Sequence, residues 1–245
     1  MSIIETLNIF NKTVLSQSNL ELEVRFNFIK NKSDFENIYN TLLKYGFKRD
    51  FEKHILKICF SDKRKSEYMD CETDSSENIR SEIQGLNHIK DFCTTETMPN
   101  ETTHIKKTKL SSVNNKDYGF KIVICKEIPC SEYEIKTLQD KFKKYRKTFR
   151  LMNRLTLKHP DMPGILIDMS IVKMKTNVSK MGQSGIFESM EIYEIEIEIE
   201  EHDKPIENLD IISNYIKKTI KYILCGKNDT NFPISEKIKQ ETLNE

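Results

Sequence analysis

One stretch near the end of the chain alternates apolar and acidic residues without a break. It runs from Tyr193 to Glu200 and reads YEIEIEIE. Successive side chains of a β-strand point to opposite faces, so this period of two places every carboxylate on one face and every isoleucine on the other. Like charges about 7 Å apart along one face repel each other. The stretch therefore predicts a strand whose acidic face meets water, basic side chains or a divalent cation.

A second alternating stretch lies near the start of the chain. In residues 20–26 (LELEVRF), Glu21, Glu23 and Arg25 share one face and the apolar residues share the other. Charged residues, mostly basic, recur on one parity of the segments between the two stretches. These segments predict further strands at residues 51–60, 78–83, 104–110, 118–127, 147–158 and 165–175. Charges thus occupy one face of nearly every predicted strand.

Helical periodicity appears in only a few places. Residues 3–18 favour a short helix or an arm, Ser33 to Gly46 a helix, residues 86–92 a brief one, and Pro205 to Gly226 the strongest. Residues 62–76 favour a loop or the end of a hairpin, and residues 131–146 stay ambiguous. Strands and helices do not alternate as in a doubly wound sheet, which favours an antiparallel α+β architecture.

The charged faces raise the question of what they meet. In an ordinary sandwich they would simply face water. A closed barrel could instead turn them into a polar lumen, with the apolar faces outside under the helices. A lumen with acids on one side and bases on the other suits a polyanion bridged to the carboxylates by a hard cation. Because only oxygen ligands are available, Mg²⁺ or Mn²⁺ fits better than a thiophilic metal.

The composition of the chain limits its possible ligands and cellular compartment. The 39 basic and 38 acidic residues give a net charge of +1, so nucleic-acid binding would depend on local segregation of charge. The chain shows neither a run of about 18 apolar residues nor a signal-peptide pattern, so no membrane association is expected. Six cysteines without a CxxC spacing and five scattered histidines give no zinc pattern. A reducing intracellular compartment is the natural expectation.

The charged strands also resemble a known family. The segments ELEVR at 21–25 and YEIEIE at 193–198 resemble the paired ExE signature of the triphosphate tunnel metalloenzymes, in particular the RNA triphosphatase domain of mRNA capping enzymes of large DNA viruses. Residues 120–129 (FKIVICKEIP), 149–158 (FRLMNRLTLK) and 167–173 (IDMSIVK) resemble three intermediate strands of that family. Met152 is a departure, because relatives often carry a base there. The resemblance spans about residues 20–224.

The resemblance implies a closed antiparallel barrel that forms a triphosphate tunnel, flanked by a few helices, and it implies roles for individual residues. The metal ligands would be Glu21, Glu23, Glu196 and Glu198. The catalytic set would add Glu194, as the candidate that orients the attacking water, together with Arg150 and Arg154. Strand parity and motif position together give the phosphate-binding candidates Arg25, Lys57, Arg80, Lys121, Arg150, Arg154, Lys158 and Lys173. Glu127 and Asp168 would hold the bases in place.

The expected function is a metal-dependent RNA 5′-triphosphatase that removes the γ-phosphate of nascent transcripts in the first step of cap formation. Nucleoside triphosphates would be additional substrates. Residues 1–226 would form the tunnel domain, and residues 227–245 a tail or a linker to guanylyltransferase and methyltransferase domains. The host cytoplasm or a virion would be its location. The alternatives are a tripolyphosphatase, a thiamine-triphosphatase-like enzyme or an adenylyl cyclase of the same fold, and a non-catalytic module that binds polyphosphate or RNA ends or docks a partner enzyme.

Overall fold

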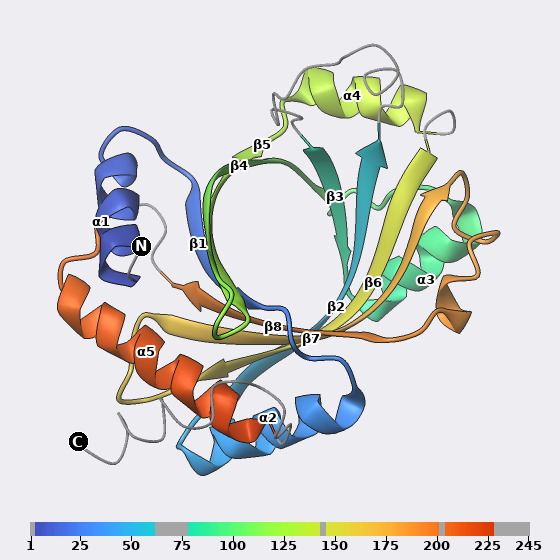
Figure 1. Ribbon diagram of the computed structural model, residues 1–245. Coiled ribbons are helices and arrows are strands. Elements are labelled where there is room, and N and C mark those ends of the chain that lie inside the picture. Colours follow the sequence, from blue (N-terminus) through green and yellow to red (C-terminus); the bar gives the residue numbers. More distant parts are fainter. Residues whose placement is uncertain (1–2, 62–77, 143–145, 201–203, 228–245) are drawn as a thin grey trace.

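A computed structural model describes residues 3–61, 78–142, 146–200 and 204–227. Within these residues, eight antiparallel strands close into a barrel in the order β1-β5-β4-β3-β2-β6-β7-β8 (Figure 1). The strands are β1 (Leu20–Phe26), β2 (Lys48–Ser61), β3 (Asn78–Gln84), β4 (Thr103–Asn115), β5 (Phe120–Pro129), β6 (Arg146–Lys158), β7 (Ile165–Val178) and β8 (Ile192–Ile199). The helices are α1 (Ile3–Val14), α2 (Lys32–Lys44), α3 (Leu86–Thr95), α4 (Glu132–Lys141) and α5 (Leu209–Gly226), with a short 3₁₀ turn η2 (Ile186–Glu188). The prediction of a closed antiparallel α+β barrel is confirmed.

The two alternating stretches close the barrel. β1 pairs with β8, so that Glu23 lies opposite Glu198 and Arg25 lies opposite Glu196. On its other side β1 pairs with β5, where Glu23 opposes Val123. The acidic strands from the two ends of the sequence therefore lie side by side, with their charged faces on the same side of the sheet.

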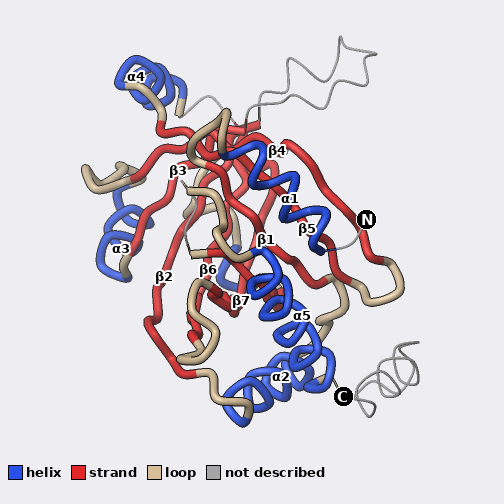
Figure 2. Tube along the Cα trace, turned by 90° about the vertical axis from the view of Figure 1, so that its left-hand side faces the viewer, coloured by secondary structure: helices blue, strands red, loops and turns tan. Residues whose placement is uncertain are grey.

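The apolar faces of the strands point outward under helices. α1, α2 and α5 cover the part of the barrel built by β1, β7 and β8 (Figures 1 and 2), with Leu22, Ile167 and Ile197 in one buried cluster with Ile220 of α5. At Gly226 a Cβ atom would lie 2.6 Å from the Cα atom of Ile38, so glycine is what lets α5 approach the backbone of α2 this closely.

A second apolar cluster lies on the opposite side of the barrel, under α3 and η2. Phe92 of α3, Phe149 of β6 and Ile186 of η2 are among its fully buried members. α4 occupies part of the segment that stayed ambiguous in sequence. It starts with a capping box in which Ser131 and Glu134 exchange hydrogen bonds, a local signal that fixes a helix start without an apolar stripe.

The longest helix begins later than its sequence suggests. α5 starts at Leu209, and before it Ile206 exchanges two hydrogen bonds with the side chain of Asn11 of α1, at 2.8 and 2.9 Å, instead of joining the helix. The predicted loop at residues 62–76 and most of the predicted C-terminal tail lie outside the described residues. None of the described helices is long and apolar enough to span a membrane.

Candidate metal and phosphate site in the barrel lumen

Strand register decides which side chains face the lumen. Directly opposed residues of antiparallel strands point to the same face, so the lumen side can be followed from Glu23 around the ring. Asp168 of β7 opposes Glu196, Arg154 of β6 opposes Ser170, and Lys57 of β2 opposes both Arg150 and Glu82. The charged residues on this side include Glu21, Glu23, Arg25, Lys53, Lys57, Arg80, Glu82, Lys107, Lys109, Lys121, Glu127, Arg150, Arg154, Lys158, Asp168, Glu194, Glu196 and Glu198.

Three carboxylates gather where β1 meets β8, and we call Glu21, Glu23 and Glu198 the acidic cluster. One oxygen from each lies within 4.8 Å of the other two. Burial, together with the charge of Glu23, raises the pKa of Glu21 to about 7, and burial beside Asp168 raises the pKa of Glu198 to about 8. Burial acts in the same direction on Glu23, but Lys107 and Arg25 outweigh it and lower the pKa of that carboxyl to about 2. The cluster is thus short of positive charge.

The acidic cluster fits a hard divalent cation. Its three oxygen ligands lie close enough together to share one ion, and oxygen is the ligand atom that Mg²⁺ and Mn²⁺ prefer. The Oε2 atom of Glu23 is buried without a hydrogen bond, although the Arg25 guanidinium lies beside it as an ion-pair partner. Because Glu21 and Glu198 take up protons most readily when no cation offsets them, a cation would bind with proton release.

Glu196 and Glu194 are held by arginines instead. The two carboxylate oxygens of Glu196 lie 3.0 Å from Arg25 Nε and 3.1 Å from an Arg154 terminal nitrogen. Glu194 accepts hydrogen bonds of 2.7 Å from Arg150. The structure therefore brings three of the four predicted metal ligands together, and it places the fourth beside them in an ion pair.

Arg154 is fixed from several directions. It donates to Asp168 at 2.6 Å, to the hydroxyl of Ser170 at 3.1 Å and to Glu196 at 3.1 Å. Asp168 in turn accepts a 2.5 Å hydrogen bond from Thr156. A guanidinium held this rigidly loses little further freedom when it binds an anion.

A second set of charges lies on β2 and β3, and we call Lys57, Arg80 and Glu82 the basic cluster. Glu82 lies 3.2 Å from Lys57 Nζ and 2.7 Å from Arg80 Nε, and Arg80 also donates to Glu127 at 2.9 Å. Burial lowers the pKa of Lys57, and the nearby Arg80 and Arg154 act in the same direction against Glu82. This part of the lumen is short of negative charge, which is the condition for binding an anion.

Two of the residues that organise the lumen, Lys107 and Glu82, were not predicted from the sequence. Lys107 of β4 contacts Glu21, Glu23 and Glu127, and Glu82 joins the two bases of its cluster. Glu82 could have been found from strand parity, because it lies two residues after Arg80. Lys107 follows another lysine, so only the pairing of β4 with β5, where Lys107 opposes Glu127, shows which of the two faces inward.

Met152, where the family resemblance led us to expect a base, lies in an apolar part of the lumen. Met152 faces the lumen between Ile55 and Val172, and all three side chains are buried against one another. This apolar band lies between Arg150 and Arg154 along β6. Arg150 and Arg154, each two residues from Met152, are therefore the bases of β6 that lie nearest to this band.

Two further predicted phosphate-binding residues, Lys121 and Lys158, lie outside the acidic and basic clusters. Lys121 faces the lumen opposite Arg25. Lys158 is half-exposed at the end of β6 and pairs with Glu200 at 2.8 Å and Asp50 at 3.2 Å.

Lys173 requires a correction. It opposes Leu151 on the outer face of the barrel, and its ammonium group donates to the backbone oxygen of Phe187 at 2.7 Å. The physical reason is parity, because five residues separate it from the lumen-facing Asp168.

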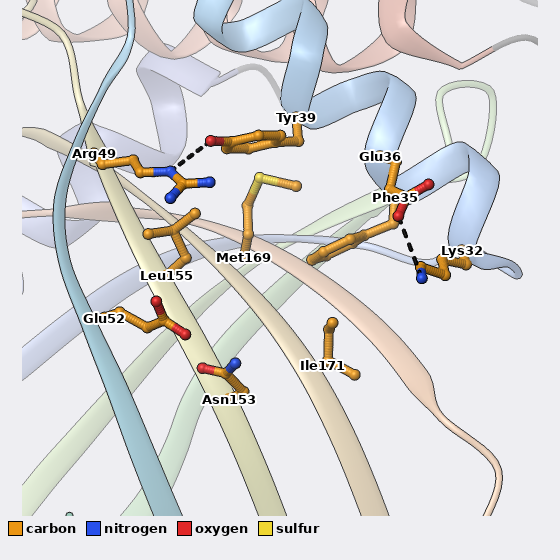
Figure 3. A pocket seen from close by; sticks show the side chains of 10 residues that line it. All are labelled: Lys32, Phe35, Glu36, Tyr39, Arg49, Glu52, Asn153, Leu155, Met169 and Ile171. Atoms are coloured by element: carbon orange, nitrogen blue, oxygen red, sulfur yellow. Dashed lines mark hydrogen bonds and ion pairs between the residues drawn. The ribbon is translucent and has the colours of Figure 1, made fainter.

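A separate groove lies outside the barrel under α2 (Figure 3). Its volume is about 210 Å³, and its floor is formed by Leu155, Met169 and Ile171. Arg49 donates to the Tyr39 hydroxyl at 2.6 Å on one side of it. Leu155 has the opposite parity to Arg154, so the strand β6 separates this groove from the lumen.

Comparisons with known proteins identify the same barrel elsewhere. No family model and no curated protein matches the chain in sequence. Among solved structures, the RNA triphosphatase domain of the trifunctional mimivirus mRNA capping enzyme superposes with a TM-score of 0.61 at 16% identity, covering 89% of this chain and 96% of that one. A triclinic structure of the mimivirus capping enzyme triphosphatase gives 0.62 at 15% identity, covering 89% and 95%.

A chain of the Schizosaccharomyces pombe Mediator head module superposes with a TM-score of 0.52 at 12% identity, covering 84% of this chain and 94% of that one. The chain therefore has the tunnel-like barrel fold of the RNA triphosphatase domain of the mimivirus capping enzyme, the fold that its paired ExE strands lead one to expect.

Proposed function

We propose that this chain is a metal-dependent RNA 5′-triphosphatase that hydrolyses the γ-phosphate from nascent transcripts in the first step of cap formation. Water attacks the γ-phosphorus, the bond to the β–γ bridging oxygen breaks, and a 5′-diphosphate end and orthophosphate leave. The observation that supports this function best is the presence, in one lumen, of an acidic cluster short of cations and a basic cluster short of anions. A triphosphate bound with a divalent cation supplies what both lack.

The acidic cluster would hold the cation. Glu21, Glu23 and Glu198 would be the ligands, and Mg²⁺ or Mn²⁺ bound there would offset the charge on the γ-phosphate and polarise it. Glu196 lies beside the cluster, and its Oε1 atom would become available as a fourth ligand once Arg25 turns to the substrate, while Arg154 stays on Oε2.

The bases would bind the phosphates. Arg150 and Arg154 reach into the lumen from β6 and donate in pairs to planar or tetrahedral oxyanions. Lys57 and Arg80 face them from the neighbouring strands, and Arg25, Lys121 and Lys158 extend the basic path along the barrel. Glu194, released when Arg150 binds phosphate, is placed to orient the attacking water.

The same proposal also specifies substrates, neighbouring domains and a cellular location. RNA 5′-triphosphate ends and nucleoside triphosphates would be substrates, and guanylyltransferase and methyltransferase domains would act on the product. We propose that residues 1–226 form the catalytic domain, that residues 227–245 lead to such a domain, and that a reducing host cytoplasm or a virion is the location.

A second function of a different class has one observation in its favour. A chain of the Mediator head module shares the fold, so a barrel of this shape also occurs within a multi-subunit assembly. A non-catalytic module that binds RNA ends or docks a partner would retain the basic cluster. It has no use for three gathered carboxylates, which is why the triphosphatase is the better proposal. Tripolyphosphatase or thiamine-triphosphatase-like activity remains the alternative among enzymes of this fold.

The deciding experiment is phosphate release from γ-labelled triphosphate-ended RNA with Mg²⁺, with Mn²⁺ and with EDTA, for the wild type and for Glu196→Ala. Metal-dependent release that the substitution abolishes is the expected result, and competition by tripolyphosphate and nucleoside triphosphates then ranks the substrates. Binding of triphosphate-ended RNA without release under either metal would overturn the proposal in favour of the binding module.

A further inference from the structure

The acidic cluster already has a cation beside it, supplied by the protein. The ammonium group of Lys107 lies 3.1 Å from Glu23 Oε1 and 2.8 Å from Glu127 Oε1, and it also contacts Glu21 Oε2. Lys107 reaches these partners from β4, across β5, which separates it from β1. Two of its three partners thus belong to the acidic cluster, and the third does not.

This arrangement conflicts with a divalent cation on the same oxygens. Two cations that share the carboxylates of Glu21 and Glu23 would lie within a few ångströms of each other, where like charges repel strongly in a buried site. Lysine has a long flexible stem, so its ammonium can move while the backbone of β4 stays in place. Glu127, which also pairs with Arg80, provides a carboxylate outside the cluster.

We infer that Lys107 is the resident counter-cation of the acidic cluster. In the metal-free protein it holds Glu21 and Glu23 together, and it gives up both carboxylates to the divalent cation while keeping its pair with Glu127. Lys107 is therefore a positioning residue that sets how tightly the site takes up metal. The inference rests on the metal site of the proposed function.

Removal of the Lys107 ammonium should lower the stability of the metal-free protein more than the stability of the metal-bound protein. Without Lys107, Glu21 and Glu23 face each other and Glu198 with less compensating charge, so the metal-free protein loses stability. A divalent cation then relieves more repulsion than in the wild type and binds more tightly. A residue with a purely structural role would instead destabilise both forms by the same amount.

The test is calorimetric titration of the protein with Mn²⁺ alone, together with thermal unfolding in EDTA and in Mn²⁺. Lys107→Met should lower the Kd for Mn²⁺ about tenfold or more, within the usual range of coupling between two sites. Its Tm should fall in EDTA and return toward the wild-type value in Mn²⁺. Lys57→Met is the matched control, since it removes the same charge from the same lumen but contacts Glu82. Its Kd should change less than that of Lys107→Met, because its ion-pair partner Glu82 lies outside the acidic cluster.

A second variant covers the case in which Lys107→Met does not fold. Lys107→Arg keeps the charge and adds donors that hold Glu21 and Glu23 more firmly, so it should weaken Mn²⁺ binding. Mn²⁺ binding by the wild type that both Lys107 variants leave unchanged, or that Lys107→Met weakens, would overturn the inference alone. No Mn²⁺ binding by the wild type would overturn it together with the metal site.

Discussion

The acidic and basic clusters lie in one lumen, yet burial acts in opposite directions on the pKa values of their side chains. In the acidic cluster, burial raises the pKa of Glu21 and Glu198, which favours their neutral acids. In the basic cluster, burial lowers the pKa of Lys57, which favours its neutral amine. Each cluster therefore keeps charges that its own partners do not fully offset. Under the proposed function, this difference would suit two ligands of opposite sign, a cation at one place and a polyanion at the other.

The largest expected effect comes from removal of one charge from the acidic cluster. Glu23→Gln keeps the shape of the side chain but removes a proposed metal ligand and the partner of Lys107 and Arg25. The kcat for phosphate release from triphosphate-ended RNA should fall by about 10³-fold, the upper range for loss of one electrostatic stabiliser. Steady-state kinetics in Mg²⁺ and in Mn²⁺ measure this change.

Glu52→Gln is the control for that substitution, because Glu52 lines the groove outside the barrel (Figure 3). It should leave kcat within about twofold of the wild type, as surface changes usually do. A Glu23→Gln variant that keeps half of the wild-type kcat would show that the acidic cluster takes no part in the reaction.

A smaller effect is expected in the basic cluster. Lys57→Met removes a buried ammonium whose partner Glu82 keeps its pair with Arg80. The loss of a charged contact to a phosphate is worth about 1.5–3 kcal/mol, which lowers kcat/KM about 10- to 100-fold. Because the ammonium is poorly compensated in the free protein, the Tm should change little. A fall in Tm with no change in kcat/KM would identify Lys57 as a structural residue.

The pH dependence of stability distinguishes the acidic cluster without any substrate. The folded protein holds protons on Glu198 up to about pH 8 and on Glu21 up to about pH 7, whereas both unfolded carboxyls release theirs near 4.5. Between these values the folded state binds more protons, so the free energy of unfolding in EDTA should fall as pH rises from about 5 to 8. Each group contributes at most ~1.4 kcal/mol per pH unit. Thermal unfolding across this range measures the slope.

Two controls sharpen the pH experiment. Glu198→Gln should flatten the slope, because its side chain no longer exchanges a proton, and Mn²⁺ should flatten it in the wild type by displacing the protons. The depressed pKa of Glu23 acts in the other direction, since its stabilisation is lost only as pH falls from about 4.5 toward 2, outside this range. A slope in EDTA that Glu198→Gln leaves intact would contradict the raised pKa.

Much of this lumen was predictable, because strict alternation of polar and apolar residues is a strong indication of a strand with one charged face. Glu21 and Glu23 fall on one parity of the first alternating strand, and Glu194, Glu196 and Glu198 fall on one parity of the second. That the acids of each strand share a face follows from the sequence alone. Parity says nothing about which charges pair across the barrel. The expected division into an acidic side and a basic side is therefore replaced by a network in which Arg154 lies between Asp168 and Glu196, and Lys107 between Glu21 and Glu127.

Pairing across strands depends on register, and register depends on bulges that no short-range pattern announces. β4 shifts by one residue against β5 between Lys109 and Ser111, and β2 shifts against β6 between Arg49 and Phe51. Such a shift moves the side chains beyond it to the other face, so parity counted back from the turn after β4 fails before it reaches Lys107. The inward position of Lys107 therefore needed the structure, whereas the outward position of Lys173 could have been read from its odd separation from Asp168.

The smallest expected effect is at Lys173, and it tests that parity argument directly. Lys173→Met removes an ammonium group that lies on the outer face and donates to the backbone of Phe187. The kcat/KM should stay within about twofold of the wild type, because a screened charge outside the barrel contributes little to an anion in the lumen. Lys57→Met, which removes the same charge from inside, is the matched comparison in the same assay. Equal losses in the two variants would mean that long-range charge, and not the face to which a lysine points, governs how the barrel binds triphosphate.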